Sequence, residues 1–239
     1  MANFGATRKS APCRLIVVGG HTRSIGKTQL VCDLIGALPM AHWIAGKITQ
    51  YGHGVCAQNG ENCGCAPNDH AVALDWESGS VPLTKSGSDS ARFLQAGAEH
   101  AFWMRTKQGY LAEGMPLLRE ALASAPPRIK PVDGNDGLNV IIESNSLLQF
   151  VKPSLYVTVL DAAREDFKDS ARRMLDRADV FVFRRGLEES DETRRPWLQL
   201  PAQSFREHRS VLQREGEPLP EPLFERVKRI LESSPTATV

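Results

Sequence analysis

Short apolar runs alternate with helically spaced apolar residues along most of the chain. Runs rich in β-branched residues predict strands at 14–18, 43–49, 101–105, 138–142, 155–160 and 180–183. Apolar residues that recur every three or four positions predict helices at about 27–38, 88–99, 116–125, 167–178 and 222–231. Strand and helix follow each other repeatedly, which predicts an α/β fold with a mostly parallel central sheet flanked by helices.

The rest of the chain is divided by composition. Residues 1–12 are small and polar without periodicity, and we expect a loose N-terminal tail there. Residues 13–239 are then expected to form a single domain. Residues 52–70 are too rich in Gly, Asn, Cys and Pro for regular structure, so we expect a loop inserted into that domain.

Two of the predicted strands end directly before an acidic residue. Glu143 follows the run 138–142, and Asp161 follows the run 155–160. Right-handed crossovers between parallel strands place these strand ends along one edge of the sheet, where α/β proteins bind their ligands. Both carboxylates are candidates to hold Mg²⁺ or its coordinating water. Glu143 is the better candidate, because a strand-end Asp often only caps a helix.

The turn between the first predicted strand and the first helix has the residues of a phosphate-binding loop, Gly20-His21-Thr22-Arg23-Ser24-Ile25-Gly26-Lys27-Thr28, followed by Gln29. Gly26 lets backbone N–H groups approach charged oxygens, and the following helix turns its positive end toward them. Lys27 can reach the β and γ phosphates, and the Thr28 hydroxyl can ligate Mg²⁺. We expect ATP or GTP to contact this loop; the alternative is a tight turn with an incidental Gly-Lys-Thr.

Arg23 lies inside this loop and has two interpretations. It can stabilise charge that develops on the γ-phosphate, in the manner of an arginine finger supplied by the same chain. It can equally be a surface residue.

A second cluster of reactive residues lies in the predicted loop. Cys56, Cys63 and Cys65 are flanked by His53 and His70, and thiolates with imidazoles are the ligands of a tetrahedral zinc site. Iron–sulfur ligation, a redox disulfide and free surface thiols are the alternatives. The other two cysteines belong elsewhere.

Composition narrows the partners and the compartment. Lys and Arg exceed Asp and Glu by a single residue, 29 against 28, so no overall basic field favours nucleic acid. No apolar run is long enough to cross a bilayer, and the odd number of cysteines, 5, does not indicate a disulfide framework. We therefore expect a cytoplasmic protein with neither nucleic acid nor membrane as its partner.

Two motifs are similar to known families. The loop spacing resembles the dethiobiotin synthetase and cobyrinic acid amide synthase group, whose loops read Gly-Thr-x-Thr-x-x-Gly-Lys-Thr. The stretch Gly87-Ser-Asp89-Ser-Ala-Arg92-Phe-Leu-Gln-Ala-Gly-Ala98 is similar to Gly-Lys-Asp-Ser-x-Arg-His-x-x-Ala-Gly-Ala of the molybdopterin-guanine dinucleotide biosynthesis protein B family. The chain thus resembles the P-loop class that includes these families and the nickel-insertion GTPases.

The resemblance implies a three-layer P-loop NTPase fold and hydrolysis of ATP or GTP in cofactor maturation. It implies that Lys47, at the end of the second predicted strand, contacts phosphate; the alternative is a solvated lysine at a strand end. It further implies that Asp89 belongs to the nucleotide site, and that Lys27, Arg23, Lys47 and Glu143 act in catalysis. It also implies a homodimer and a client protein or cofactor-synthesis enzyme as partner. Arg184-Arg185 stands where guanine-specific relatives have Asn-Lys, so ATP and GTP both remain open.

Two other functions are compatible with the same motifs. A metallochaperone would couple its nucleotide state to an ion in the Cys/His loop, as nickel-insertion GTPases do. An ATP-dependent small-molecule kinase or ligase would resemble dethiobiotin synthetase.

Overall fold

The computed structural model describes residues 12–52, 71–78, 87–125, 137–185 and 209–239. The strands are β1 (Pro12–Gly20), β2 (Ile44–Tyr51), β3 (Val72–Ser78), β4 (His100–Lys107), β5 (Leu138–Glu143), β6 (Leu155–Leu160), β7 (Val180–Phe183), β8 (Ser210–Leu212) and β9 (Ala237–Thr238). The α-helices are α1 (Lys27–Ala37), α2 (Asp89–Gln95), α3 (Leu111–Ser124), α4 (Asp169–Arg172) and α5 (Glu221–Glu232). Short 3₁₀ turns are η1 (Pro39–Ala41), η2 (Ser146–Gln149) and η3 (Leu175–Arg177).

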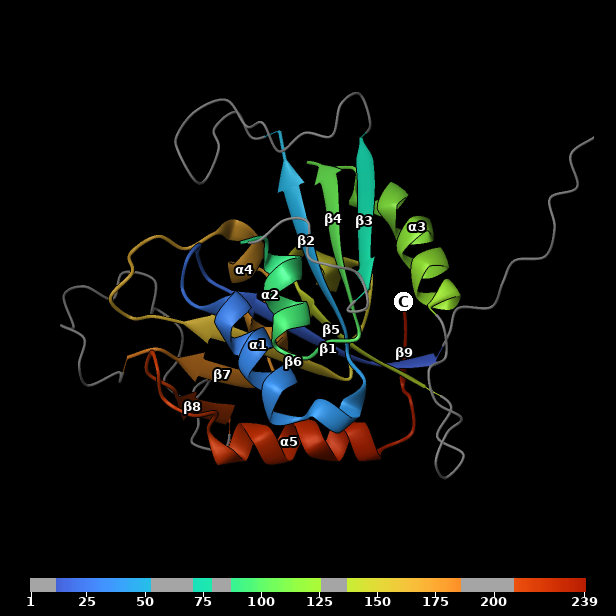
Figure 1. Ribbon diagram of the computed structural model, residues 1–239. Helices are drawn as coiled ribbons and strands as arrows, with labels where there is room; N and C mark the ends of the chain where they lie inside the picture. Colours follow the sequence, from blue (N-terminus) through green and yellow to red (C-terminus); the bar gives the residue numbers. More distant parts are fainter. Residues whose placement is uncertain (1–11, 53–70, 79–86, 126–136, 186–208) are drawn as a thin grey trace, which may run out of the picture.

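All of these strands belong to one sheet, in the order β3-β4-β2-β5-β1-β6-β7-β8, and β9 pairs with β1. Every pairing from β4 to β8 is parallel, whereas β3 and β9 run antiparallel to their neighbours. This confirms the predicted α/β fold with a mostly parallel sheet. Because β1 lies between β5 and β6, the turn after β1 emerges near the middle of the sheet (Figure 1).

Helices cover both faces of the sheet (Figure 1). Ile16 and Val18 of β1 pack in the same cluster as residues of α1, α2 and α5, whereas Leu15 and Val17 pack in the cluster that contains α3. Successive side chains of a strand point to opposite faces, so a strand that is buried on both sides is apolar at every position. The continuous apolar run of β1 is therefore explained by its central place.

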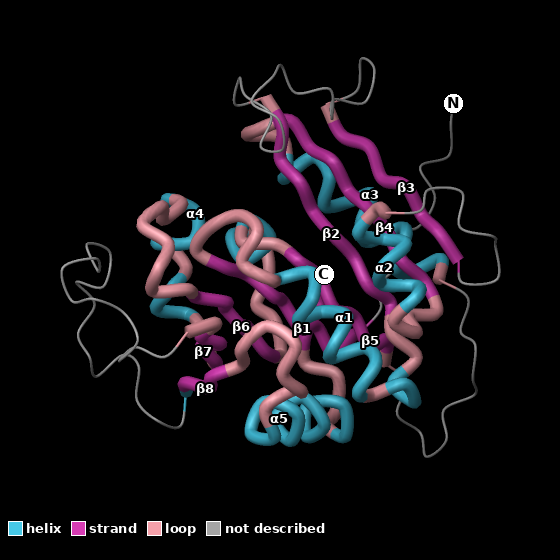
Figure 2. Tube along the Cα trace, turned by 60° about the vertical axis from the view of Figure 1, so that its left-hand side comes forward, coloured by secondary structure: helices cyan, strands magenta, loops and turns pink. Residues whose placement is uncertain are grey.

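The sheet is not uniform along its width, because three strands extend beyond the others (Figures 1 and 2). β2 pairs with β4 along its whole length but with β5 only from Ile44 to Lys47. Beyond Lys47, the strands β2, β4 and β3 continue without the rest of the sheet. Lys47 was predicted at the end of its strand; it lies in the middle of β2, at the point where β2 leaves β5.

Several predicted boundaries were wrong. The predicted tail includes Pro12, which already belongs to β1, and the edge strand β3 was missed because all of its side chains are half-buried. α3 begins at Leu111 rather than Pro116, since Leu111 and Met115 are buried and extend the helix. The helix predicted at 167–178 is only the single turn α4 followed by η3. None of the described helices is long and apolar enough to cross a membrane.

Gly46 is a point of close approach between β2 and β4. It lies opposite Phe102 in the pairing of the two strands, and a Cβ at Gly46 would overlap the Phe102 ring. Phe102 is fully buried and stacks on Trp76 of β3, with ring centroids 5.8 Å apart. A glycine at this position therefore lets an aromatic ring cover the backbone directly beside Lys47.

Replacing Gly46 with Ala should destabilise the protein by about 1–3 kcal/mol, because the added methyl group overpacks a filled core. Urea denaturation followed by circular dichroism measures this change. Gly36→Ala is the matched control, since a Cβ there meets only the Ala96 carbonyl oxygen at 3.8 Å and the residue lies in α1. Equal stability of the Gly46→Ala and Gly36→Ala variants would contradict the packing described.

Candidate functional site

The turn between β1 and α1 is a loop with two left-handed residues. Gly26 has φ of 84° and Ser24 has φ of 51°, and α1 begins at the next residue, Lys27. Glycine adopts this conformation without strain, which explains its place at the end of the loop. The N-terminal N–H groups of α1 therefore lie at the loop, as the sequence predicted.

Lys27 crosses the loop that it terminates. Its ammonium donates to the carbonyl oxygen of Thr22 at 2.7 Å. Burial lowers the pKa of Lys27; the carboxylate of Glu143 opposes this shift and the charge of Lys47 adds to it. A partly desolvated ammonium in this position would bind an anion strongly.

A chain of four side chains joins four different elements beside the loop. The Thr28 hydroxyl of α1 donates to Glu143 Oε2 at 2.6 Å. Lys47 Nζ of β2 lies 3.3 Å from Glu143 Oε1 and 2.5 Å from Asp89 Oδ2, at the start of α2. Burial alone would lower the pKa of Lys47, but the carboxylates of Glu143 and Asp89 outweigh it and the pKa is raised. Lys47 is therefore a charged link between the two acids.

The position of Asp89 follows from the cap of its helix. The Ser88 hydroxyl accepts the N–H of Ala91 at 3.1 Å and thereby caps α2. Asp89, in the first turn, is left to bind Lys47, and Arg92 lies 3.9 Å from its other oxygen. Arg92 also donates to Gln29 Oε1 at 2.9 Å, which ties α2 to the first turn of α1.

The first half of the loop faces away from the cleft. His21 and Thr22 are buried, and the ring centroid of His21 lies 5.2 Å from that of Phe167. Thr22 Oγ1 donates to Asp166 Oδ2. Arg23 and Ser24 are exposed and line the cleft together with Ile25. The side chains of His21 and Thr22 are therefore structural, and Arg23 is the loop's cation at the surface.

Asp161 borders the same cleft but has other partners. Its carboxylate accepts the N–H of Ala163 at 3.0 Å and lies 3.6 Å from Arg185 Nε. The structure thus brings Glu143 to Thr28, whereas the bonds of Asp161 are to its own turn and to Arg185.

Three residues that the sequence did not predict as supports of the loop hold it in place, Asn145 and Arg184 directly and Gln213 through Arg184. Asn145 forms a reciprocal pair with Gly20, with its Oδ1 2.9 Å from the Gly20 N and its Nδ2 2.8 Å from the Gly20 O. Arg184 donates to the carbonyl oxygens of Ile25 at 3.2 Å and Gly26 at 2.7 Å. Gln213, which is 1% exposed, accepts from Arg184 at 2.9 Å.

These contacts have a weak sequence signal. Asn145 follows Glu143 by two residues, and Arg184 directly follows β7, so both lie at the edge where ligands bind in parallel sheets. Arg184 was noticed only as a departure from the Asn-Lys of guanine-specific relatives. Its side chain points to the loop backbone instead of standing free for a base.

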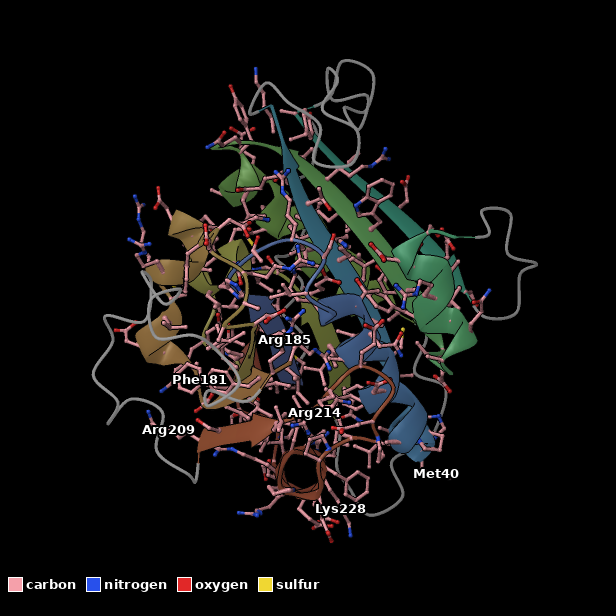
Figure 3. The ribbon with its side chains drawn as sticks, turned by 90° about the vertical axis from the view of Figure 1, so that its left-hand side faces the viewer. Met40, Phe181, Arg185, Arg209, Arg214 and Lys228 are labelled. Atoms are coloured by element: carbon pink, nitrogen blue, oxygen red, sulfur yellow. The ribbon has the colours of Figure 1, made fainter. Side chains whose placement is uncertain are left out.

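The loop, α2 and the ends of β5 to β8 enclose a cleft of about 1910 Å³. Arg185 and Arg214, which line it, are labelled in Figure 3 near the ends of β7 and β8. The cations that line the cleft are Arg23, Lys27, Lys47, Arg92, Arg164, Lys168, Arg184, Arg185 and Arg214. The acids that line it are Asp33, Asp89, Glu143, Asp161, Asp169, Glu215 and Glu217. The cleft is large enough for a nucleotide and rich in groups that bind phosphate.

The predicted Cys/His cluster, with Cys56, Cys63, Cys65, His53 and His70, lies outside the described residues. Among the residues that the structure does describe, no group of three or more His, Cys, Asp or Glu side chains could hold a metal ion. Cys13 and Cys32 lie apart on β1 and α1, and burial raises the pKa of each thiol to about 11.

Arg184→Met should destabilise the protein by about 1–3 kcal/mol, because carbonyl oxygens of Ile25 and Gly26 and the amide of Gln213 lose a charged donor. Arg185→Met is the matched control: its side chain is 57% exposed and its ion pair with Asp161 is worth at most about 1 kcal/mol. Guanidinium denaturation of both variants measures the difference. Equal losses would show that Arg184 does not hold the loop.

Comparison with known proteins adds no relative from which a function could be transferred. No model of a known protein family matches the chain, and no curated protein matches its sequence. The assignment of a function therefore rests on the fold and on the geometry of the cleft.

Proposed function

We propose that the chain binds a nucleoside triphosphate, ATP or GTP, in this cleft and hydrolyses it. The observation that carries the proposal is the bond from Thr28 to Glu143, with Lys47 beside it, next to a loop that ends in Gly26-Lys27. These groups come from α1, β5 and β2, and they meet at the C-terminal edge of a parallel sheet, where ligands of α/β proteins bind.

The oxygens of Thr28 and Glu143 fit a magnesium ion. They lie 2.6 Å apart, at the first turn of α1 and at the end of β5. Mg²⁺ binds to proteins through one or two oxygen ligands and shares the phosphates of its nucleotide. When bound, it would neutralise negative charge on the phosphate oxygens.

The remaining groups bind and orient the phosphates. Lys27 would exchange its bond to the Thr22 carbonyl for the β and γ oxygens, and the N–H groups at the start of α1 would bind phosphate oxygens. Arg23 and Lys47 line the same cleft and would stabilise charge that develops during attack by water. Asn145 and Arg184 hold both ends of the loop, so these donors are positioned before the nucleotide arrives.

A role in cofactor maturation is the finer part of the proposal, and it rests on the resemblance to the molybdopterin-guanine dinucleotide biosynthesis protein B family. The stretch that carries this resemblance begins α2, and Asp89 within it bonds to Lys47 at 2.5 Å. This contact supports a place for that stretch in the nucleotide site. The base stays open, because Arg184 is engaged with the loop.

Lys27→Met should lower both nucleotide affinity and the rate of hydrolysis by about 100-fold, since a half-buried cation that we place against the phosphates is lost. Isothermal titration calorimetry and phosphate release with Mg²⁺ and either ATP or GTP measure the two effects. Lys228→Met, on the far helix α5 (Figure 3), is the control and should match the wild type. Purified wild-type protein that neither binds nor hydrolyses either nucleotide would overturn the proposed function.

Glu143→Gln should reduce the gain in nucleotide affinity that Mg²⁺ provides more than it reduces nucleotide affinity without Mg²⁺. The variant keeps an acceptor for Thr28 but loses the negative charge, so the gain in nucleotide affinity on adding Mg²⁺ should fall by about 10-fold or more. Titrations with and without EDTA measure this gain. Asp161→Asn tests the weaker candidate, and a larger effect there than at Glu143 would exchange the roles of the two acids.

A further inference from the structure

The chain between β6 and α4 packs against the first half of the loop. Thr22 Oγ1 donates to Asp166 Oδ2, and the N–H of Lys168 donates to the carbonyl oxygen of His21 at 2.8 Å. The Phe167 ring contacts the His21 ring with centroids 5.2 Å apart. Side-chain and main-chain contacts therefore fix the backbone of Lys168 to the loop itself.

The side chain of Lys168 lines the same cleft as Lys27, Arg23 and Lys47. Lys47 is paired with Glu143, but the ammonium of Lys168 forms no hydrogen bond or ion pair within the described part of the chain. Burial lowers the pKa of Lys168 to about 8, and the positive charges of Lys27 and Arg23 act in the same direction. Asp166 opposes this shift and Lys47 adds to it.

Like charges that face one another in a partly buried cleft are unfavourable unless an anion joins them. The cations near Lys168 repel it, as its interactions with Lys27, Arg23 and Lys47 show. Asp166 keeps its negative charge while it accepts the hydrogen bond of the neutral Thr22 hydroxyl, and it offsets part of this repulsion. Among the described residues that line the cleft, nine cations face seven acids, so positive charge exceeds negative charge there.

Lys168 and Arg184 contact opposite ends of the loop. Arg184 bonds to the loop at Ile25 and Gly26, beside β7 and β8. The main-chain N–H of Lys168 donates to the opposite part of the loop, at the His21 carbonyl oxygen. The Lys168 ammonium is repelled by the charges of Lys27 and Lys47. Lys27 is the residue that reaches the β and γ phosphates of a nucleotide in a loop of this kind.

We propose that Lys168 binds the terminal phosphoryl group of the nucleoside triphosphate, as a further catalytic cation supplied from the chain after β6. This inference rests on the proposed function. Lys168 would add positive charge at the group on which negative charge is redistributed when the terminal phosphate is transferred to water. It would also let the site distinguish a triphosphate from a diphosphate, which lacks that group.

The test compares Lys168→Met with the wild type for two ligands, a non-hydrolysable nucleoside triphosphate and the matching diphosphate, both with Mg²⁺. The variant should bind the triphosphate about 10-fold more weakly or worse, the loss expected for one charge-assisted contact, while its diphosphate affinity stays near that of the wild type. Lys168→Arg keeps the charge and should restore most of the triphosphate affinity. Lys152→Met, an exposed lysine before β6, is the matched control and should change neither.

The pH dependence of binding gives an independent signature. An ammonium with a pKa of about 8 is charged below that pH and neutral above it. The phosphate is already fully ionised there, since its second ionisation lies at about pH 6. The preference of the wild type for triphosphate over diphosphate should therefore fall as the pH rises above about 8. The preference of Lys168→Arg should stay flat, because a guanidinium remains charged.

Lys168→Arg leaves the other charged residues that line the cleft unchanged, Arg164 and Asp169 of the same segment among them. A shift in the pH profile on Lys168→Arg is therefore a property of residue 168. Equal weakening of both nucleotides by Lys168→Met, or no weakening, would overturn the inference and leave the proposed function standing. Wild-type protein that binds neither nucleotide would overturn both.

Discussion

The side chain of Glu143 is 6% exposed, and a charge so far from water is stable only when it is paired and hydrogen-bonded. Lys47 supplies the positive charge and Thr28 supplies a hydrogen bond. The pairing of β2 with β5 places Lys47 directly opposite Glu143, and the pairing of β5 with β1 places Glu143 beside the loop that leads to Thr28. The order β2-β5-β1 is therefore what keeps this carboxylate compatible with a folded core.

The same order determines how the loop is held. Its start is fixed by Asn145, which follows β5, and its first side chains are buried under the chain that follows β6. Its end is fixed by Arg184, which follows β7. β5 lies on one side of β1, and β6 and β7 lie on the other, so the loop after β1 is supported from both of its sides. Donors held in this way need little reorganisation when an anion binds.

The early departure of β2 from β5 shapes the other side of the cleft. Past Lys47, β2 continues with β4 and β3 alone, so the sheet edge steps outward there (Figure 2). Gly46 permits the Phe102 ring to cover the backbone next to Lys47. Asp89 of α2 accepts a hydrogen bond from the Lys47 ammonium. The cleft thus lies between the loop and the three projecting strands, with Lys27 and Arg23 on one side and Lys47 on the other. This is the cleft in which we propose that the phosphates of a nucleotide bind.

The periodicity of the sequence determined the α/β fold, since a continuous apolar run or a helical spacing is a local property of each segment. It also determined that a Gly-Lys-Thr turn and the acids Glu143 and Asp161 would meet at one edge. The periodicity did not predict that Lys47 pairs with Glu143, or that Asn145 and Arg184 bind the loop backbone. Lys47, Asn145, Arg184 and Lys168 contact residues that are far from them in the chain, and which strands become neighbours depends on the packing of the whole sheet. The apolar run of the half-buried edge strand β3 ends at Leu74 and is followed by Asp75 and Glu77, so only its pairing with β4 revealed the strand. The sequence alone thus determined which chemistry lies at the edge of the sheet, and the tertiary structure decided which side chains meet there, because hydrogen bonds and ion pairs form between strands that local patterns do not order.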